Sequence, residues 1–105
     1  MKKYKLVMTA EAKADLKNIL SYLQKTFHNQ QAVRNVWDDF QETKKTMARS
    51  AGSLPEPESE RLKERRLKRV NFLRHSYFML YIIENETAVI VNIFHNLEDF
   101  ENKLK

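Results

Sequence analysis

The chain of 105 residues has the length of one domain with a single hydrophobic core, and we expect residues 1–105 to form that domain. It contains no cysteine, which excludes disulfides and thiolate metal sites and suits a reducing cytoplasmic location. Its 19 Lys and Arg outnumber its 14 Asp and Glu, and the resulting net charge of +5 suits an acidic or phosphate-bearing partner.

Several classes of protein are disfavoured by what the sequence lacks. No apolar stretch approaches the roughly 20 residues of a membrane span, and no signal peptide is visible, so we expect no membrane association. No glycine-rich phosphate loop or nucleophile motif is present, which disfavours a metabolic enzyme, and we expect no cofactor. The three histidines are far apart in sequence and lack acidic residues at helical ligand spacing, so we expect no metal site.

The first half of the chain predicts a strand and two helices. Residues 4–8 form a short apolar run, and Thr9 can cap the helix that follows it. The apolar face of that helix consists of Ala12, Leu16, Ile19, Leu20, Leu23 and Phe27. After Asn29, a candidate cap, a second helix runs to about Ser50, with an apolar face of Val33, Val36, Trp37, Phe40 and Met47. The two helices predict an antiparallel hairpin whose apolar faces pack on the rest of the chain.

The second half predicts a loop and then strands. Residues 51–60 hold the only glycine and both prolines, and we expect them to form a loop. Strands are expected at residues 66–73, 77–83 and 87–95, the last two joined by Glu84-Asn85-Glu86 as a hairpin. Residues 77–83 are apolar on both faces, which is typical of a central strand covered on both sides. The helices can cover one side, and a smaller element or a partner must help to cover the other.

Alternation divides the last strand into two faces. Val89, Val91, Ile93 and His95 are expected on one face, and Ala88, Ile90, Asn92 and Phe94 on the other. Residues 96–105 predict a short polar C-terminal helix. The fold class is therefore α+β: an N-terminal strand and a helical hairpin packed on a mainly antiparallel sheet of about four strands.

The positive charge is concentrated in one stretch, residues 61–74. This stretch holds seven of the 19 basic residues and one of the 14 acidic ones, so the rest of the chain carries 12 basic and 13 acidic residues. The seven are Arg61, Lys63, Arg65, Arg66, Lys68, Arg69 and Arg74. A basic surface on a sheet suits either phosphates or an acidic protein segment. If about four of these residues contacted phosphates, log K would fall with log salt at a slope near −3.

The order of elements resembles the RelE/ParE superfamily of bacterial type II toxins, which includes plasmid stabilisation proteins. The similar positions are Val7-Met8-Thr9, Ala12, Asp15-Leu16, Ile19 and Tyr22-Leu23 in the first strand and helix, Arg66-Leu67 in the second strand, and Tyr77-Phe78-Met79-Leu80-Tyr81 and Ile93-Phe94-His95 with Asp99 in the last two strands. The similarity covers nearly the whole chain. It implies a growth-inhibiting toxin that a cognate antitoxin neutralises through an acidic segment.

The resemblance leaves the target and the activity open. It implies either ribosome-associated mRNA cleavage or action on DNA gyrase. Phe78 stands where the family usually carries an arginine, and Leu97 and Glu98 stand where arginines commonly follow the histidine. These departures favour an alternative: a non-catalytic or degenerate module on the same fold that binds an antitoxin or nucleic acid through its basic strand.

If the protein is an enzyme, we expect a metal-independent endoribonuclease. Such a reaction needs an acid and a base for the two oxygens, and cations that hold the phosphate. Candidates are His95 as acid or base, Arg66 and Arg69 as phosphate ligands, and Tyr81 or Tyr77 for base stacking. Each also has a structural interpretation, because His95 ends an apolar strand and Tyr81 lies in one. His28 and His75 are expected in turns.

The same stretch supplies the candidate binding residues. Binding of nucleic acid or antitoxin is assigned to Lys63, Arg65, Arg66, Lys68, Arg69 and Arg74.

Overall fold

The computed structural model describes residues 3–53 and 59–96 of the chain. Its elements in chain order are β1 (Lys5–Met8), α1 (Ala10–Phe27), α2 (Gln30–Ser50), the 3-10 turn η1 (Ala51–Ser53), α3 (Glu60–Glu64), β2 (Lys68–Asn71), β3 (Tyr77–Glu84) and β4 (Thr87–His95). The predicted C-terminal helix, with Leu97, Glu98 and Asp99, lies outside the described residues, as do Glu56 and Glu58.

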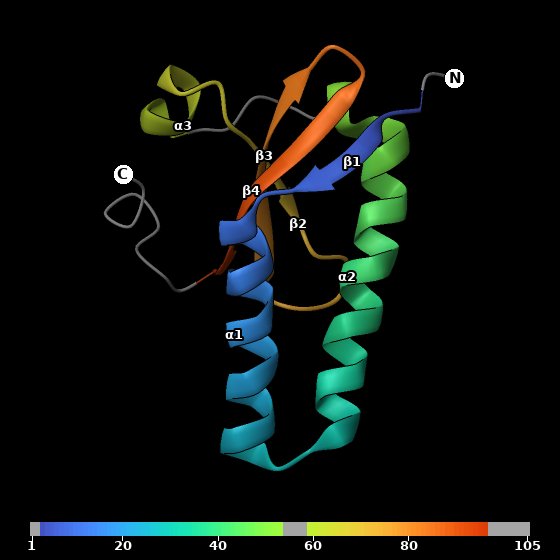
Figure 1. Cartoon of the computed structure of the whole chain (residues 1–105), viewed down its shortest axis with the longest axis vertical. Coiled ribbons are helices and arrows are strands. Elements are labelled where there is room, and N and C mark those ends of the chain that lie inside the picture. Colours follow the sequence, from blue (N-terminus) through green and yellow to red (C-terminus); the bar gives the residue numbers. More distant parts are fainter. Residues whose placement is uncertain (1–2, 54–58, 97–105) are drawn as a thin grey trace.

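The described strands form a four-stranded sheet in the order β1-β4-β3-β2 (Figure 1). β2, β3 and β4 are antiparallel neighbours, while β1 runs parallel to β4. A parallel pair requires a long connection, and here everything from α1 to β3 lies between the two strands in sequence. The α+β fold with a mainly antiparallel sheet is confirmed.

The helical hairpin begins and turns at the expected polar residues. Thr9 Oγ1 accepts a hydrogen bond from Ala12 N at 3.1 Å, which caps α1. Asn29 Oδ1 accepts from the backbone N–H groups of Gln31 and Ala32 and caps α2. Between the helices, His28 has a left-handed backbone with φ 50°, as turn residues at helix ends often do. The predicted caps and the turn position of His28 are therefore confirmed.

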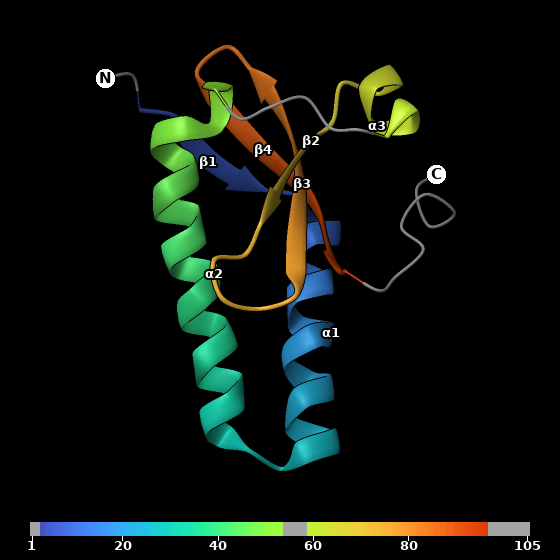
Figure 2. The ribbon, with the colours of Figure 1, turned by 180° about the vertical axis from the view of Figure 1, so that it is seen from behind.

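The two faces of the sheet are covered by different elements. α1 and α2 pack on one face, here called the hairpin face, and α3 lies over the other, here called the α3 face (Figures 1 and 2). The hairpin face carries Phe40, Met79, Tyr81, Ile90 and their neighbours, while Phe78, Leu80, Phe94, Leu62 and Leu67 form a smaller cluster beneath α3. The expectation that a smaller element covers the second face of β3 is confirmed.

The loop expected at residues 51–60 is only partly correct. The described part of it begins with η1, and α3 follows with Ser59 as its cap, since Ser59 Oγ accepts from Leu62 N. The strand expected at residues 66–73 is shorter, because β2 covers only Lys68–Asn71. Residue 66 belongs to the turn after α3 rather than to a strand.

A bulge in β4 overturns the expected alternation of that strand. Tyr81 pairs with Ile90 and Leu80 pairs with Asn92, which leaves Val91 as an extra residue. Ile90 and Ile93 therefore both belong to the hairpin-face core, while Val91 and Phe94 pack with the cluster under α3. Strict alternation is wrong beyond Val91, because one inserted residue exchanges the faces of all that follow.

Two aromatic side chains that were expected on buried helix faces are largely exposed. Phe27 is 59% exposed at the end of α1, and Trp37 is 41% exposed on α2. Both lie towards the hairpin turn, away from most of the sheet. Within the described residues, no helix is long and apolar enough to cross a membrane.

Candidate functional site

Most of the basic stretch surrounds α3. Arg61, Lys63, Arg65 and Arg66 lie on this short helix or in the turn after it, and all four are exposed. Lys63 forms an ion pair with Glu60 within the helix, with 3.5 Å between Nζ and Oε1. Leu62 and Leu67 are buried against the sheet, so the inner side of α3 is apolar. The four basic side chains therefore lie on its outer side.

Arg66 has a structural role that depends on its backbone conformation and not on its charge. Its φ of 58° places it in the left-handed region, which glycine normally occupies at the end of a helix. Arg66 N donates to Lys63 O at 3.0 Å and Leu67 N donates to Leu62 O at 2.8 Å, the two hydrogen bonds of a Schellman motif. The apolar contact that accompanies this motif is made by Leu62 and Leu67.

Arg69 lies on the α3 face of the sheet. Its guanidinium carbon is 3.9 Å from the centroid of the Phe78 ring, and its Nε donates to Asn71 Oδ1 at 3.0 Å. Partial burial lowers the pKa of Arg69 from its usual value, but the group stays charged. Phe78, which stands where the resemblance implies an arginine, thus lies beneath an arginine from the neighbouring strand.

Lys68 and Arg74 are directed away from this group. Lys68 pairs with Tyr81 in the sheet, one position from Arg69, so it belongs to the opposite face of β2. Arg74 follows β2 and forms an ion pair with Glu42 of α2, which raises the pKa of Arg74. The seven basic residues therefore do not form one surface.

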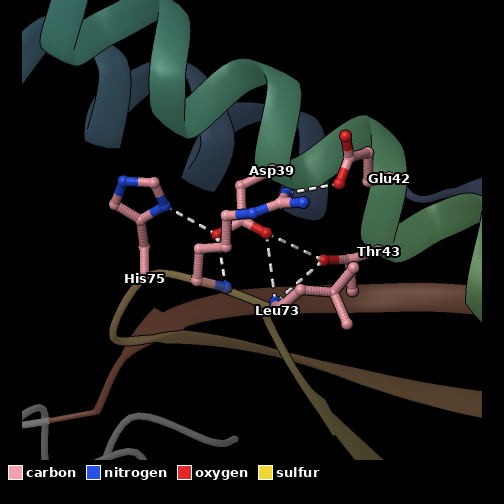
Figure 3. A network of polar contacts seen from close by, with 6 residues as sticks. Asp39, Glu42, Thr43, Leu73 and His75 are labelled. Atoms are coloured by element: carbon pink, nitrogen blue, oxygen red, sulfur yellow. Dashed lines mark hydrogen bonds and ion pairs between the residues drawn. The ribbon is translucent and has the colours of Figure 1, made fainter.

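A buried carboxylate connects α2 to the turn between β2 and β3 (Figure 3). Asp39 is 1% exposed and accepts hydrogen bonds from Leu73 N at 3.1 Å and Arg74 N at 3.0 Å. Its Oδ2 also lies 2.6 Å from His75 Nδ1. Burial alone would raise the pKa of Asp39, but the hydrogen bonds from His75 and Arg74 N outweigh it and lower the pKa below its usual value. His75 lies in a turn as expected, but sequence patterns gave no sign of its buried partner.

Tyr81 cannot meet a substrate in this structure. It has no exposed surface, and its hydroxyl donates to Ala51 O at 2.8 Å inside the main core. The structure therefore favours the structural interpretation of Tyr81 over a catalytic role, which stays a prediction. Tyr77, the other candidate for base stacking, is half-buried at the start of β3.

His95 lies at the mouth of a cleft of about 670 Å³ between α1 and the end of the sheet. It pairs with Tyr77 and meets that ring edge-on, with 5.2 Å between ring centroids. The charged residues of α1 that line the cleft are Glu11 and Asp15, and no described Lys or Arg lines it. Asp15 accepts hydrogen bonds from Ile93 N and Asn92 Nδ2, which join α1 to β4 next to the bulge.

The candidate catalytic residues are consequently not brought together. His95 pairs with Tyr77 and shares its face, the hairpin face, whereas Arg69 lies over Phe78 on the α3 face. The sheet separates the imidazole from the guanidinium. In the described part of the chain, no group of three side chains could hold a metal ion either.

Comparison with known proteins agrees with this fold. In the search of solved structures, a chain from "Chromosomal ParDE TA system from P. aeruginosa" matches with a TM-score of 0.73 and 17% identity, covering 89% of the present chain and 96% of that one. Among curated proteins, none has a significantly similar sequence. The present chain thus shares the fold of this chain from a ParDE system.

The sequence identifies the family of the protein as well as its fold. Residues 6–100 match the family described as ParE toxin of type II toxin-antitoxin system, parDE. The chain belongs to this family, which confirms the resemblance, and membership implies an antitoxin partner.

Proposed function

We propose that this protein is a growth-inhibiting toxin that acts by binding its target, DNA gyrase, rather than by cutting mRNA. One observation carries the preference: His95 and Arg69 lie on opposite faces of the sheet. Metal-independent RNA cleavage requires acid–base groups and phosphate-holding cations around one phosphate. The burial of Tyr81 supports the same preference.

A second candidate is a degenerate toxin that binds an antitoxin without harming the cell. It is favoured by Phe78, which has no exposed surface beneath α3 at the position where relatives usually carry an arginine. Restoring an arginine there is a poor test, because it would bury a charge next to Leu62 and Leu80 and disturb folding. The candidates are better separated by the effect of the unaltered protein.

The test is induction of the unaltered protein in cells that lack its antitoxin. We expect growth arrest, intact polysomal mRNA and DNA breaks. Cut transcripts without DNA breaks would contradict the proposal and support the nuclease. A folded protein without any growth effect would support the degenerate module. The uninduced culture and a Leu62→Asp variant, expected to unfold, are the controls.

A further inference from the structure

A second basic surface exists that the sequence does not display. Its residues line a groove of about 340 Å³ between α2 and β1, with four cations at Lys3, Lys44, Lys45 and Arg49. Tyr4 N donates to Ala48 O at 2.7 Å, which brings the start of the chain against the last turns of α2. Both ribbon views show these two elements side by side (Figures 1 and 2). The groove thus joins residues about forty positions apart.

The four groove cations have no counter-charge among the described residues, whereas Lys63 and Arg74 of the basic stretch are held in ion pairs. One of the four, Lys44, has an aromatic contact instead, with 4.9 Å between its Nζ and the centroid of the Phe40 ring. None of the four groove cations forms an ion pair within residues 3–53 and 59–96, and no described acidic residue lines the groove. Lys45 and Arg49 are four residues apart on one helix, where like charges repel each other.

The helix dipole explains the position of only one of the four groove cations. It favours a cation in the last turn of a helix, and Arg49 occupies that turn of α2. Lys44 and Lys45 lie more than one turn before the end, and Lys3 is not on a helix. The concentration of unpaired charge therefore indicates a partner that supplies the negative charge.

The floor of the groove indicates what kind of partner fits. Leu6, half-buried in β1, and Ala48, on α2, line it between the basic side chains. An apolar floor favours an apolar side chain and offers little to a sugar-phosphate backbone. A peptide with carboxylates around an apolar residue satisfies both features, with charge-assisted hydrogen bonds at the rim.

We propose that this groove binds an acidic segment, containing an apolar side chain, of a protein partner. In a toxin of this family that partner is the antitoxin, so its identity rests on the proposed function. The groove lies at the β1 edge of the sheet, whereas β2 forms the opposite edge. The antitoxin segment and the basic residues around α3 therefore occupy separate surfaces.

The test uses the full chain and three fluorescein-labelled probes of equal length: a peptide of alternating glutamate and leucine, polyglutamate, and oligodeoxythymidylate. Fluorescence anisotropy should show the tightest binding for the glutamate–leucine peptide. The variant with Lys44→Gln, Lys45→Gln and Arg49→Gln should bind it roughly ten-fold more weakly, if each lost pair contributes what exposed ion pairs typically do. Its circular dichroism and melting temperature should match those of the unaltered protein.

The matched control is the variant with Arg61→Gln, Lys63→Gln and Arg65→Gln, which also loses three positive charges. It should bind the glutamate–leucine peptide nearly as well as the unaltered protein. Equal weakening in both variants, or no binding of the peptide by the unaltered protein, would overturn the proposal. Tighter binding of the oligonucleotide, lost in the groove variant alone, would overturn it in favour of a nucleic-acid site. The proposed function is tested by growth arrest in cells that lack the antitoxin. A failure of that proposal can therefore be distinguished from a failure of the groove to bind the peptide.

Discussion

Asp39 combines four interactions in one buried side chain. It holds two backbone N–H groups of the turn after β2, lies against His75, and accepts a hydrogen bond from Thr43 Oγ1 at 3.3 Å. Thr43 Oγ1 also accepts from Leu73 N, so the two side chains of α2 share this backbone group. A buried carboxylate that loses its charge or its geometry leaves several donors unsatisfied.

Asp39→Asn should lower the free energy of unfolding by roughly 2–3 kcal/mol at neutral pH, because an amide cannot accept at both positions. The folded-state pKa of Asp39 lies below the ordinary value of 3.8, so its contribution is present above that value and is lost as the pH falls through the folded-state pKa. Urea unfolding should therefore show the gap between the two proteins narrowing in acid.

The exposed neighbour Asp38 provides the control for this prediction. Asp38→Asn should leave the stability nearly unchanged and should keep the acid dependence of the unaltered protein. A constant gap between Asp39→Asn and the unaltered protein down to the most acidic pH would show that the charge of Asp39 does not contribute.

Arg66 offers a way to separate charge from backbone geometry. Arg66→Gly should leave the protein as stable as before or up to about 1 kcal/mol more stable, because glycine adopts φ 58° without strain. Arg66→Val removes the same charge but should cost about 1–2 kcal/mol, since a branched side chain is strained there. Thermal melts of the two variants check this.

Target binding is the second measurement on this pair. If Arg66 contacts the target through its charge, both folded variants should bind equally weakly. Adding Arg69→Ala should weaken target binding further than Arg66→Gly alone. Unchanged binding in Arg66→Gly, together with a loss in Arg66→Val, would assign the whole effect to the backbone.

At the scale of elements, α3 has more influence than its five residues suggest. It places Leu62, 1% exposed, over Phe78 and Leu80, and so closes the second face of the sheet. Without it, the most apolar strand of the protein would be covered on one side only. The helix thereby also fixes where Arg61 and Arg65 lie.

Leu62→Ala should lower the free energy of unfolding by about 2–4 kcal/mol, because it removes buried methyl groups and leaves a cavity. Leu73→Ala is the matched control, since Leu73 is 52% exposed and should cost well under 1 kcal/mol. Urea unfolding of the two variants compares them directly. Equal losses would mean that α3 does not seal the sheet.

The elements that could be predicted are those with a long, regular pattern. The helical hairpin, its caps and the apolar β3 strand followed from periodicity and from Thr9 and Asn29. α3 was missed because five residues contain barely one apolar repeat. The bulge was missed because both faces of β4 are mainly apolar, so the pattern does not reveal the exchange of faces after Val91.

At the scale of the whole molecule, charge was the least predictable property. The run of residues 61–74 is visible in the sequence, yet folding directs its members to both faces of the sheet. The groove at α2 and the pair Asp39–His75 are invisible in the sequence, because each is assembled from segments that are distant along the chain. Only the packing of β1 and of the β2–β3 turn against α2 brings them together.

The extra residue at Val91 decides which chemical groups are neighbours. Were β4 to continue without the bulge, Val91 would pair with Leu80 and Phe94 with Tyr77, so Phe94 would turn towards the helices and His95 towards the face of Arg69. An imidazole and a guanidinium would then share one side of the sheet, as phosphodiester cleavage demands. In this chain, one bulged residue therefore decides that the imidazole and the guanidinium lie on different faces of the sheet.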